Sequence, residues 1–566
     1  DNYDVGGSKA KTQYAYNKLG NIETITYHDG VQHQFAYNPA VLLTQAINPT
    51  AEVKLDYDTM GNIVAETQNG HKITNTYNNL GQRTHLQSSL GANLNLEHNH
   101  LGQLVKMTTQ SEQNPWEASF GYDQMGLEIQ RLLPGQVQQT TTRDALGRPT
   151  EQLTGHASKR QRSRKYNWST SNRLTQIIDT ATGTTHFDYN KEGYLTQAKY
   201  ADGSTTNRYP DAKGNLFESA DLKDREYERG GKLVKKGSWH YKYNHQGFLT
   251  EKYKKTGSIF SFKEDQWFYD WNSAGLLEAV KRPDGFVVKF TYDALGRRLT
   301  KTYKQTTTNW VWDGNVPLHE WKGFVSKDAL SENLITWIFE EDSFSPIAKL
   351  RGEKKYSILA DHLGTPYESY DDKGDLVWSR ELNANGKVLK ETGIANFCPF
   401  LYQGQSLDNE IELAYNRFRY YDVEDGRYIS QDPIGLASGE PNFYAYVEDS
   451  NFWIDPLGLK TYNGNDKRSK KKNHLYEIYN NKTGETYKFG ISGGKKTKKN
   501  ESIRANSQKN KIATAEGISE NDISTRIVKD NMKRETALNQ EQKAVNNFNS
   551  NNGSAPKYNL RPKPTN

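Results

Sequence analysis

Residues 55–61 read LDYDTMG, and this pattern decides the fold because it recurs along the chain. The unit is a short alternating stretch that ends in an aromatic residue, followed by Asp or Asn, two or three further residues, and Gly. Alternation is typical of a half-buried strand, and Asp or Asn followed by Gly supplies the cap and the positive-φ position of a tight turn. Each unit therefore predicts one β-hairpin. Further copies are YAYNKLG (14–20), NTYNNLG (75–81), LEHNHLG (96–102), FGYDQMG (120–126), TTRDALG (141–147), FDYNKEG (187–193), YKYNHQG (241–247) and FTYDALG (290–296).

Composition also favours a large β protein. Only 34% of the 566 residues are hydrophobic, yet 35 Tyr, 20 Phe and 11 Trp provide aromatic rings that suit half-buried sheet positions. A repeat of about 20 residues indicates a stacked or spiralling architecture. Because sheets twist, hairpins that pair edge to edge curl into a wall that hides its edges. We therefore predict a mainly β fold, a hollow shell of spiralling hairpins, followed by a small α+β domain at the C-terminus.

The charge of the chain is divided unevenly between its two parts. Residues 460–566 contain 23 Lys and Arg against 10 Asp and Glu, whereas residues 1–459 contain 51 against 58. This split indicates a polyanion-binding unit attached to an acidic carrier. No apolar run is long enough for a membrane-spanning segment, and the N-terminus lacks a signal-peptide pattern. The only cysteine, Cys398, stands in the apolar sequence NFCPF and is expected to be buried packing.

Over residues 1–310 the repeats resemble the YD repeats of the Rhs, Tc-toxin C-component and teneurin families. Residues 311–459 resemble the end of an Rhs core, through ADHLGTP (360–366), PFLYQGQ (399–405) and AYNRFRYYDVEDGRYISQDPIGL (414–436). The resemblance implies a secreted effector whose shell encloses a toxin and delivers it into the cytoplasm of a target cell. It also implies a delivery apparatus, reached through an N-terminal region missing from this sequence, and a cognate immunity protein.

A candidate cleavage junction lies where the charge changes. DPxGL occurs at 432–436 and again at 455–459, and the resembled families cut after the final Leu, here the Leu459–Lys460 bond. Two carboxylates that share a proton can divide the roles of base and acid. We predict Asp432 and Asp455 as this pair, with Arg427 holding one carboxylate ionised. The other candidate carboxylates are Asp422, Asp425 and Asp449, and the alternative interpretation is that both Asp-Pro pairs merely cap turns.

The basic tail, residues 460–566, contains a predicted hairpin at 475–492, LYEIYNNKTGETYKFGIS, then a helix near 503–504 and a second helix at 534–548. From about residue 473 to 564 it resembles a diverged GIY-YIG, or URI-type, endonuclease. The resemblance implies Tyr476 beside the attacking water, Arg504 on the phosphate, Glu541 as ligand of Mg²⁺ or another divalent cation, and Asn559 as a late polar residue of the site.

The second tyrosine of the resembled motif is displaced in this sequence. Its position carries Lys488, with Tyr487 one residue earlier, and either side chain could serve. One carboxylate and several waters suit Mg²⁺, which would stabilise the leaving oxygen in phosphodiester cleavage. Nucleic acid is the expected partner, with DNA favoured over RNA. The alternatives are an RNase or tRNase, another toxic enzyme, or a teneurin-like adhesion protein, against which the lack of disulfides counts.

Overall fold

In the computed structural model, the chain divides into two compact units, Asp1–Thr461 and Tyr462–Asn566. We call them the shell unit and the tail unit and describe each by itself. The structure describes residues 2–5, 8–109, 115–124, 126–156, 158–256, 262–323, 333–438, 441–459, 473–492, 501–532, 534–552, 554 and 556–558. Within these residues, no helix combines the length and the apolar character needed to span a bilayer.

The shell unit is built from two large antiparallel sheets. The first, the N-terminal sheet, runs from β3 (Gln13–Tyr16) to β21 (Thr205–Asn207), and the second, the central sheet, from β24 (Arg225–Glu228) to β39 (Val388–Gly393). In both sheets each strand pairs with its neighbours in the chain, as the hairpin repeat predicts. The central sheet continues through β32 (Thr306–Asp313) and β33 (Val316–Lys322), so the fading of the repeat near residue 310 does not interrupt it.

The repeated Tyr and Asp have separate tasks in each hairpin. In the hairpin of β7 (Ala51–Tyr57) and β8 (Ile63–Gln68), Oδ1 of Asp58 accepts from the amides of Met60 and Asn62, both at 2.9 Å, and Gly61 adopts a φ of 84°. The Tyr57 hydroxyl donates to the carbonyl of Leu43 at 2.7 Å, on the strand of the preceding hairpin. The aspartate thus closes its own turn and the tyrosine ties one hairpin to the previous one. The same tie joins Tyr37 to Ile22, Tyr77 to Ile63, Tyr122 to Leu104, Tyr189 to Leu174 and Tyr292 to Leu277.

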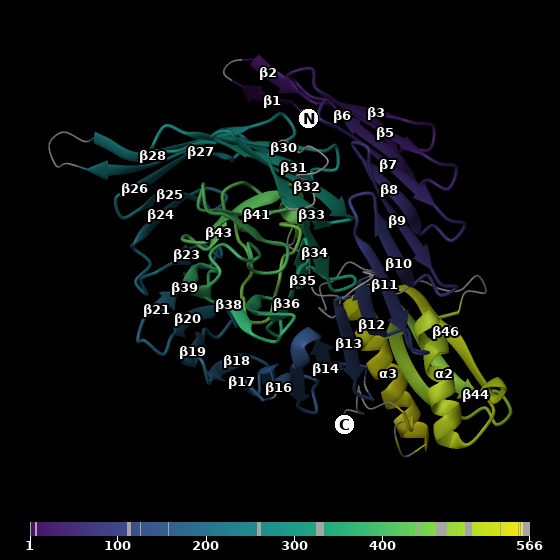
Figure 1. Cartoon of the computed structure of the whole chain (residues 1–566). Helices are drawn as coiled ribbons and strands as arrows, with labels where there is room; N and C mark the ends of the chain where they lie inside the picture. Colours follow the sequence, from purple (N-terminus) through teal and green to yellow (C-terminus); the bar gives the residue numbers. More distant parts are fainter. Residues whose placement is uncertain are drawn as a thin grey trace. The chain divides into compact units, whose positions relative to one another are not determined.

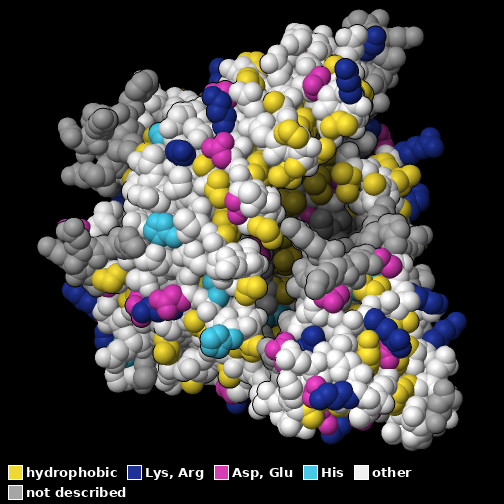
Figure 2. All heavy atoms as spheres, turned by 90° about the vertical axis from the view of Figure 1, so that its right-hand side faces the viewer, with side chains coloured by type: hydrophobic (Ala, Val, Ile, Leu, Met, Phe, Trp, Pro, Cys, Tyr) yellow, Lys and Arg dark blue, Asp and Glu magenta, His cyan; other side chains and the backbone are white. Residues whose placement is uncertain are grey.

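The two large sheets pack against each other through an apolar cluster that includes Leu94, Phe120, Leu318 and Tyr370. Polar contacts cross the same boundary, for example from Nε1 of Trp116 to Oγ of Ser357 at 3.0 Å. Some apolar residues of the hairpin turns stay at the surface, among them Leu19, Met60 and Leu80. Figure 2 shows hydrophobic side chains gathered around a hollow on one face of the molecule.

After β39 the chain turns inward. It forms a small sheet from β40 (Ser406–Asp408), β41 (Leu413–Asn416), β42 (Arg419–Asp422) and β43 (Arg427–Tyr428). Figure 1 shows β41 and β43 surrounded by strands of the two large sheets. Leu413, Tyr415 and Tyr420 pack in one cluster with residues of the central sheet, and Cys398 is buried among aromatic rings as predicted. The interior position of this segment places its carboxylates away from water.

The tail unit is a three-stranded antiparallel sheet with two helices. β44 (Asn473–Asn480) lies between β45 (Thr486–Ser492) and β46 (Ile523–Met532), and the helices are α2 (Ile503–Glu516) and α3 (Arg534–Asn552). The hairpin and both helices agree with the prediction. The predicted order of hairpin, helix, helix was wrong in one respect, because the strand β46 stands between the helices and pairs with the free edge of β44.

Candidate functional site

Asp432 and Asp455 approach the same guanidinium in the interior of the shell unit. Nη2 of Arg419 lies 3.2 Å from Oδ2 of Asp455 and 3.4 Å from Oδ2 of Asp432. Arg419 and Asp455 are buried at 1% and 0% exposure, and Asp432 at 7%. A cation between two buried carboxylates offsets part of the cost of burying their charge.

The backbone around the second DPxGL copy is held tightly against this pair. Oδ1 of Asp455 accepts from the amide of Leu459 at 3.0 Å, and Nε of Arg419 donates to the carbonyl of Gly458. Gly404 has a φ of 83°, and a Cβ there would lie 2.0 Å from the carbonyl oxygen of Pro456. Only glycine fits this contact. The close packing at Pro456 and the hydrogen bond from the Leu459 amide together hold the end of the motif beside the carboxylate of Asp455.

A tyrosine and an asparagine complete the surroundings of Asp455. The Tyr428 hydroxyl donates to Oδ2 of Asp455 at 2.8 Å, and Nδ2 of Asn416 donates to the Tyr428 hydroxyl at 2.7 Å and to the Asp455 carbonyl at 3.0 Å. Burial and the neighbouring Asp455 charge raise the pKa of Tyr428 well above its usual value, so the phenol remains a proton donor. Neither residue was singled out in the sequence, although Tyr428 lies only four residues before Asp432.

The structure puts Arg419, and not Arg427, between the two carboxylates. The Arg427 guanidinium donates to the carbonyl of Gly231 and lies over the rings of Tyr227, at 5.2 Å, and Tyr444, at 4.9 Å. Arg427 follows the turn that ends β42, so it pairs with β42 across the small sheet. The proximity of Arg427 to Asp432 in the sequence therefore does not translate into a contact with that carboxylate.

The three other candidate carboxylates have partners elsewhere. Asp422 is 3.1 Å from Nζ of Lys252, and Asp425 is 3.1 Å from Nζ of Lys236. Burial opposes the ionisation of Asp425, but the charges of Lys252 and Lys236 hold its pKa well below the usual value. Asp449 is 3.4 Å from Nη1 of Arg173, and burial raises its pKa to about 6.

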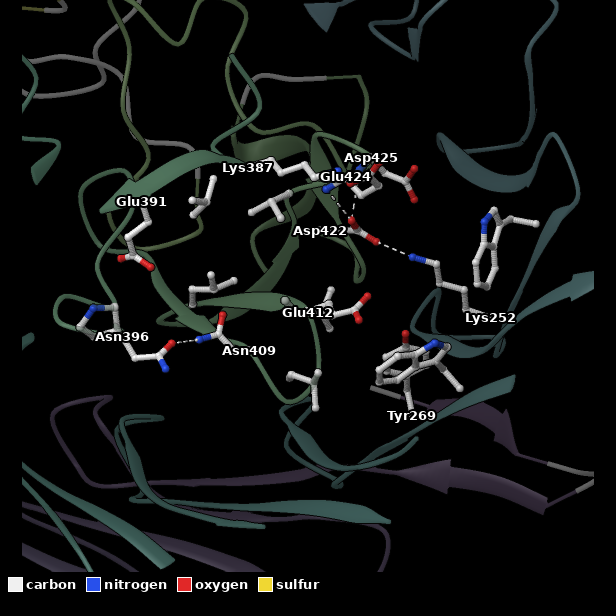
Figure 3. Close-up of a pocket in the computed structure, with 18 of the residues that line it drawn as sticks. Lys252, Tyr269, Lys387, Glu391, Asn396, Asn409, Glu412, Asp422, Glu424 and Asp425 are labelled. Atoms are coloured by element: carbon white, nitrogen blue, oxygen red, sulfur yellow. Dashed lines mark hydrogen bonds and ion pairs between the residues drawn. The ribbon is translucent and has the colours of Figure 1, made fainter. Parts of the chain in front are cut away.

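Asp422 and Asp425 belong to the wall of a separate cavity of about 700 Å³. Figure 3 shows Glu391, Asn409 and Glu412 on one side of it and Lys252 with Tyr269 on the other. Lys252 also lies over the Trp239 ring, 5.3 Å from the ring centroid. The wall mixes acids, lysines and aromatic rings, so the cavity has no single charge sign that would define a ligand.

In the tail unit, the two predicted tyrosines share one face of the sheet. Tyr476 and Tyr487 are both buried and pack in one cluster with Ala505 and Ile512 of α2. Nε2 of Gln508 donates to the Tyr476 hydroxyl at 3.2 Å. A Cβ at Gly490 would lie 2.4 Å from the Tyr476 oxygen, which explains why the neighbouring strand carries glycine opposite this ring.

A β-bulge accounts for the displaced second tyrosine. Ile478 pairs with Lys488, and the next residue, Tyr479, pairs with Thr486, so Tyr487 is the extra residue of β45. Lys488, opposite Ile478, therefore lies on the same face as Tyr476, and Tyr487 joins the same cluster. Both alternatives for the second motif remain on the face of the sheet that α2 covers.

The remaining predicted nuclease residues lie apart from this cluster or outside the described part. Glu541 is buried on α3, three residues before Ala544, which packs against Leu475 and Ile491 on the opposite face of the sheet. Arg504 is in the first turn of α2, but its side chain is outside the described residues, as are Asn559 and Lys460.

The residues that the structure describes provide only a sparse set of metal ligands. They contain no group of three or more His, Cys, Asp or Glu side chains placed so that it could hold a metal ion. Glu541 is thus the one carboxylate that the prediction offers to a metal. This fits Mg²⁺ only in the form that keeps most of its waters and takes further oxygens from a phosphate.

The repeated Tyr-tied hairpins define the shell unit as a YD-repeat shell. Residues 165–438 match the family model of the teneurin YD-shell. Among curated proteins, the chain is 27% identical over 452 residues to double-stranded DNA deaminase toxin A of Burkholderia cenocepacia and 27% identical over 450 residues to probable deoxyribonuclease RhsB of Dickeya dadantii. Each match covers 72% of this chain and 30% of the relative, so the chain spans less than a third of these proteins.

Solved structures show the same fold. The Tc holotoxin pore of Photorhabdus luminescens has a TM-score of 0.57 at 15% identity, covering 81% of this chain and 27% of that chain. The structure of TcdB2-TccC3-TEV gives the same TM-score and identity, covering 79% and 27%. The family model and the solved structures thus agree with the YD-repeat shell fold of the shell unit.

Proposed function

We propose that this chain is the toxin-bearing end of an Rhs effector, and that Asp432 and Asp455 cleave the Leu459–Lys460 bond within the chain. The observation that carries the proposal is the buried pair of carboxylates bridged by Arg419, with the amide of Leu459 hydrogen-bonded to Asp455. The last residue before the bond is thereby held beside one member of an acid–base pair.

The chemistry requires only water and the two carboxyl groups. The ionised carboxylate accepts a proton from water as the oxygen attacks the carbonyl carbon of Leu459, and the protonated one gives its proton to the leaving nitrogen of Lys460. Leu459 then ends in a carboxylic acid and Lys460 begins with a free amine. Burial of the pair keeps competing water away and strengthens the effect of the Arg419 charge.

Mass spectrometry of the purified chain tests self-cleavage. The wild type is expected as two fragments, one beginning at Lys460, whereas Asp432→Asn and Asp455→Asn are expected as a single 64.6 kDa species. Asp188→Asn, at an exposed position of β19 (Gly183–Tyr189), is the matched control and is expected to cleave. An intact wild-type chain, or full cleavage of either Asn variant, would contradict the proposal.

We further propose that the tail unit hydrolyses nucleic acid, with DNA favoured over RNA. Its net charge of +13, from 23 basic and 10 acidic residues, supports contact with phosphates. The names of the relatives, a DNA deaminase toxin and a probable deoxyribonuclease, support a toxin that acts on nucleic acid. The Tyr476 phenol, held between Gln508 and Gly490, is the group proposed to orient the attacking water.

The other residues of the proposed nuclease site have roles defined by charge. Lys488 or Tyr487 would act beside Tyr476, Arg504 would neutralise a phosphate oxygen, and Glu541 would hold Mg²⁺, which when bound supplies positive charge at the leaving oxygen. Glu541 lies on α3 and Tyr476 faces α2, on opposite faces of the sheet, so in the described arrangement the two side chains do not reach one phosphate together. The roles of Glu541 and Tyr476 are therefore two separate proposals.

Cleavage assays separate the possible activities. The purified chain, and the tail fragment released from it by denaturant and refolded, would be incubated with plasmid DNA or tRNA in Mg²⁺ or EDTA. We expect DNA cleavage in Mg²⁺ that Tyr476→Phe and Glu541→Gln each reduce, with Tyr479→Phe, on the opposite face, as control. Cleavage of tRNA in EDTA would identify a metal-independent RNase, and no cleavage of either substrate would refute the nuclease proposal.

The biological setting belongs to the same proposal. The toxin names of the relatives support secretion and delivery of the tail unit into a target cell. A delivery apparatus and a cognate immunity protein that neutralises the tail unit are proposed with it. The immunity protein is tested by co-expressing the chain with candidate immunity proteins and asking which of them co-purifies with the tail unit.

A further inference from the structure

The contacts of Asp455 form a directed chain of hydrogen bonds. The Asn416 amide nitrogen donates to the Tyr428 oxygen at 2.7 Å, and that oxygen lies 2.8 Å from Oδ2 of Asp455. An amide NH₂ can only donate, so the phenol accepts from Asn416 and its own proton is left for Asp455. The direction of the hydrogen bonds is therefore fixed. Asn416 on β41 donates to Tyr428 on β43, and Tyr428 donates its own proton to the carboxylate of Asp455.

Three donors are directed at the side-chain carboxylate of Asp455. Oδ2 accepts from Tyr428 and from Nη2 of Arg419 at 3.2 Å, and Oδ1 accepts from the amide of Leu459 at 3.0 Å. Donors directed at a carboxylate favour its ionised form. Other charged or titratable groups near Asp455 are Asp432, through the shared Arg419, and Tyr446. Arg419 lies between Asp432 and Asp455, so its positive charge faces both carboxyl groups.

We infer that Tyr428 is a positioning residue of the self-cleavage reaction, and that its hydrogen bond orients the Asp455 carboxylate as the member of the pair that accepts the proton of water. This inference rests on the proposed self-cleavage. Asp432 is then the protonated member, which gives its proton to the leaving nitrogen of Lys460. The Tyr428 ring has a second task, since the Arg419 guanidinium carbon lies 3.5 Å from its centroid, so the ring locates the shared cation while the hydroxyl acts on Asp455.

The test separates the hydroxyl from the ring. Tyr428→Phe keeps the ring beneath Arg419 and removes the proton donor. Tyr421→Phe is the matched control, because Tyr421 is equally buried and its hydroxyl donates to the carbonyl of Asn385 at 2.8 Å, away from the carboxylate pair. Each variant would be made by cell-free synthesis, and the intact chain followed in a pulse-chase between pH 4 and pH 9.

We expect Tyr428→Phe to cleave about tenfold to hundredfold more slowly than wild type, the effect of losing a hydrogen bond to a charged group. We also expect the acid side of its pH profile to move to higher pH, because a hydrogen-bond donor directed at a carboxylate favours the carboxylate form and this donor is lost. Tyr421→Phe should keep the wild-type rate and profile. A purely structural role for Tyr428 would slow cleavage without moving the profile, and an unchanged profile overturns the inference.

Two further variants keep the outcome decisive. If Tyr428→Phe fails to fold, as judged by size-exclusion chromatography, Asn416→Ala takes its place; it should move the profile in the same direction by a smaller amount, and an unchanged profile again overturns the inference. Asp455→Asn tests the underlying reaction. Normal cleavage by Asp455→Asn refutes the proposed function itself. If Asp455→Asn does not cleave but Tyr428→Phe cleaves with the rate and pH profile of the wild type, only the role of Tyr428 is refuted.

Discussion

Asp449 provides a test of the electrostatics of the shell interior. Its carboxyl is fully buried, 3.4 Å from Nη1 of Arg173, and burial raises its pKa from the usual 3.8 to about 6, against the opposing charges of Arg173 and Arg208. The folded chain thus binds this proton more tightly than the unfolded chain. Asp449 contributes most to stability below about pH 4, and this contribution is lost as the pH rises toward 6.

The size of the effect follows from the interval between the two pKa values, which corresponds to about 3 kcal/mol. Asp449→Asn cannot lose a proton, so the free energy of unfolding of the variant, relative to wild type, should improve by about that amount between pH 4 and pH 7. The variant also loses the charge contact with Arg173, and this changes its free energy of unfolding by a constant amount above pH 6.

The assay is guanidinium unfolding of the shell unit at pH 4, 5, 6 and 7, followed by tryptophan fluorescence, for wild type and variant side by side. Asp188→Asn, at an exposed strand position, controls for removal of a carboxyl group as such. A difference between wild type and Asp449→Asn that stays constant from pH 4 to pH 7 would refute the reasoning, as would a difference that grows in the opposite direction.

Three further predictions concern other parts of the chain. Gly490→Ala should destabilise the tail unit by about 1–3 kcal/mol, because the new Cβ would lie 2.4 Å from the Tyr476 oxygen; an unchanged thermal midpoint of the tail fragment would contradict this. Tyr57→Phe should cost the shell unit about 1 kcal/mol through loss of the bond to Leu43, measured by denaturant unfolding, and a neutral result would show that the tie adds nothing. Binding of DNA to the tail fragment should weaken linearly on a log–log plot against salt concentration, whereas a flat plot would exclude phosphate contacts.

The hairpins of the shell could be predicted because everything that forms them is local. Asp58 caps a turn that closes three residues later, and Tyr57 reaches a carbonyl only 14 residues back. Such contacts require the same residue types at a regular spacing in the sequence, and that spacing predicted the strands of the shell unit. Turn chemistry and strand alternation agree at each repeat, so no tertiary information was needed.

The carboxylate pair shows what local reasoning cannot supply. Asp432 and Asp455 stood out because the same motif surrounds both, but the arginine between them lies 36 residues before Asp455. Arg427 was the nearer candidate along the chain. The small sheet turns that arginine toward Tyr227 and Tyr444 instead, and no pattern in the sequence indicates which strand of a four-stranded sheet faces the pair.

The strand β46 was missed for a different reason. Ile523, Thr525 and Ile527 alternate with polar residues, which is a strand pattern, but Arg526 and the charges that follow make the segment look like a solvated linker. The structure shows why a charge is tolerated there: Nε of Arg526 donates to Glu477 of the neighbouring strand at 2.6 Å. The charged position is paired across the sheet, and only the pairing reveals this.

The tyrosine tie between consecutive hairpins has a consequence for how such walls vary in size. The tie itself joins each unit only to the one before it, so the same tie can form again at the new junction when a whole unit is gained or lost by duplication or deletion. The length of such a wall can then change in steps of one repeat, while the tyrosine tie at every remaining junction stays the same.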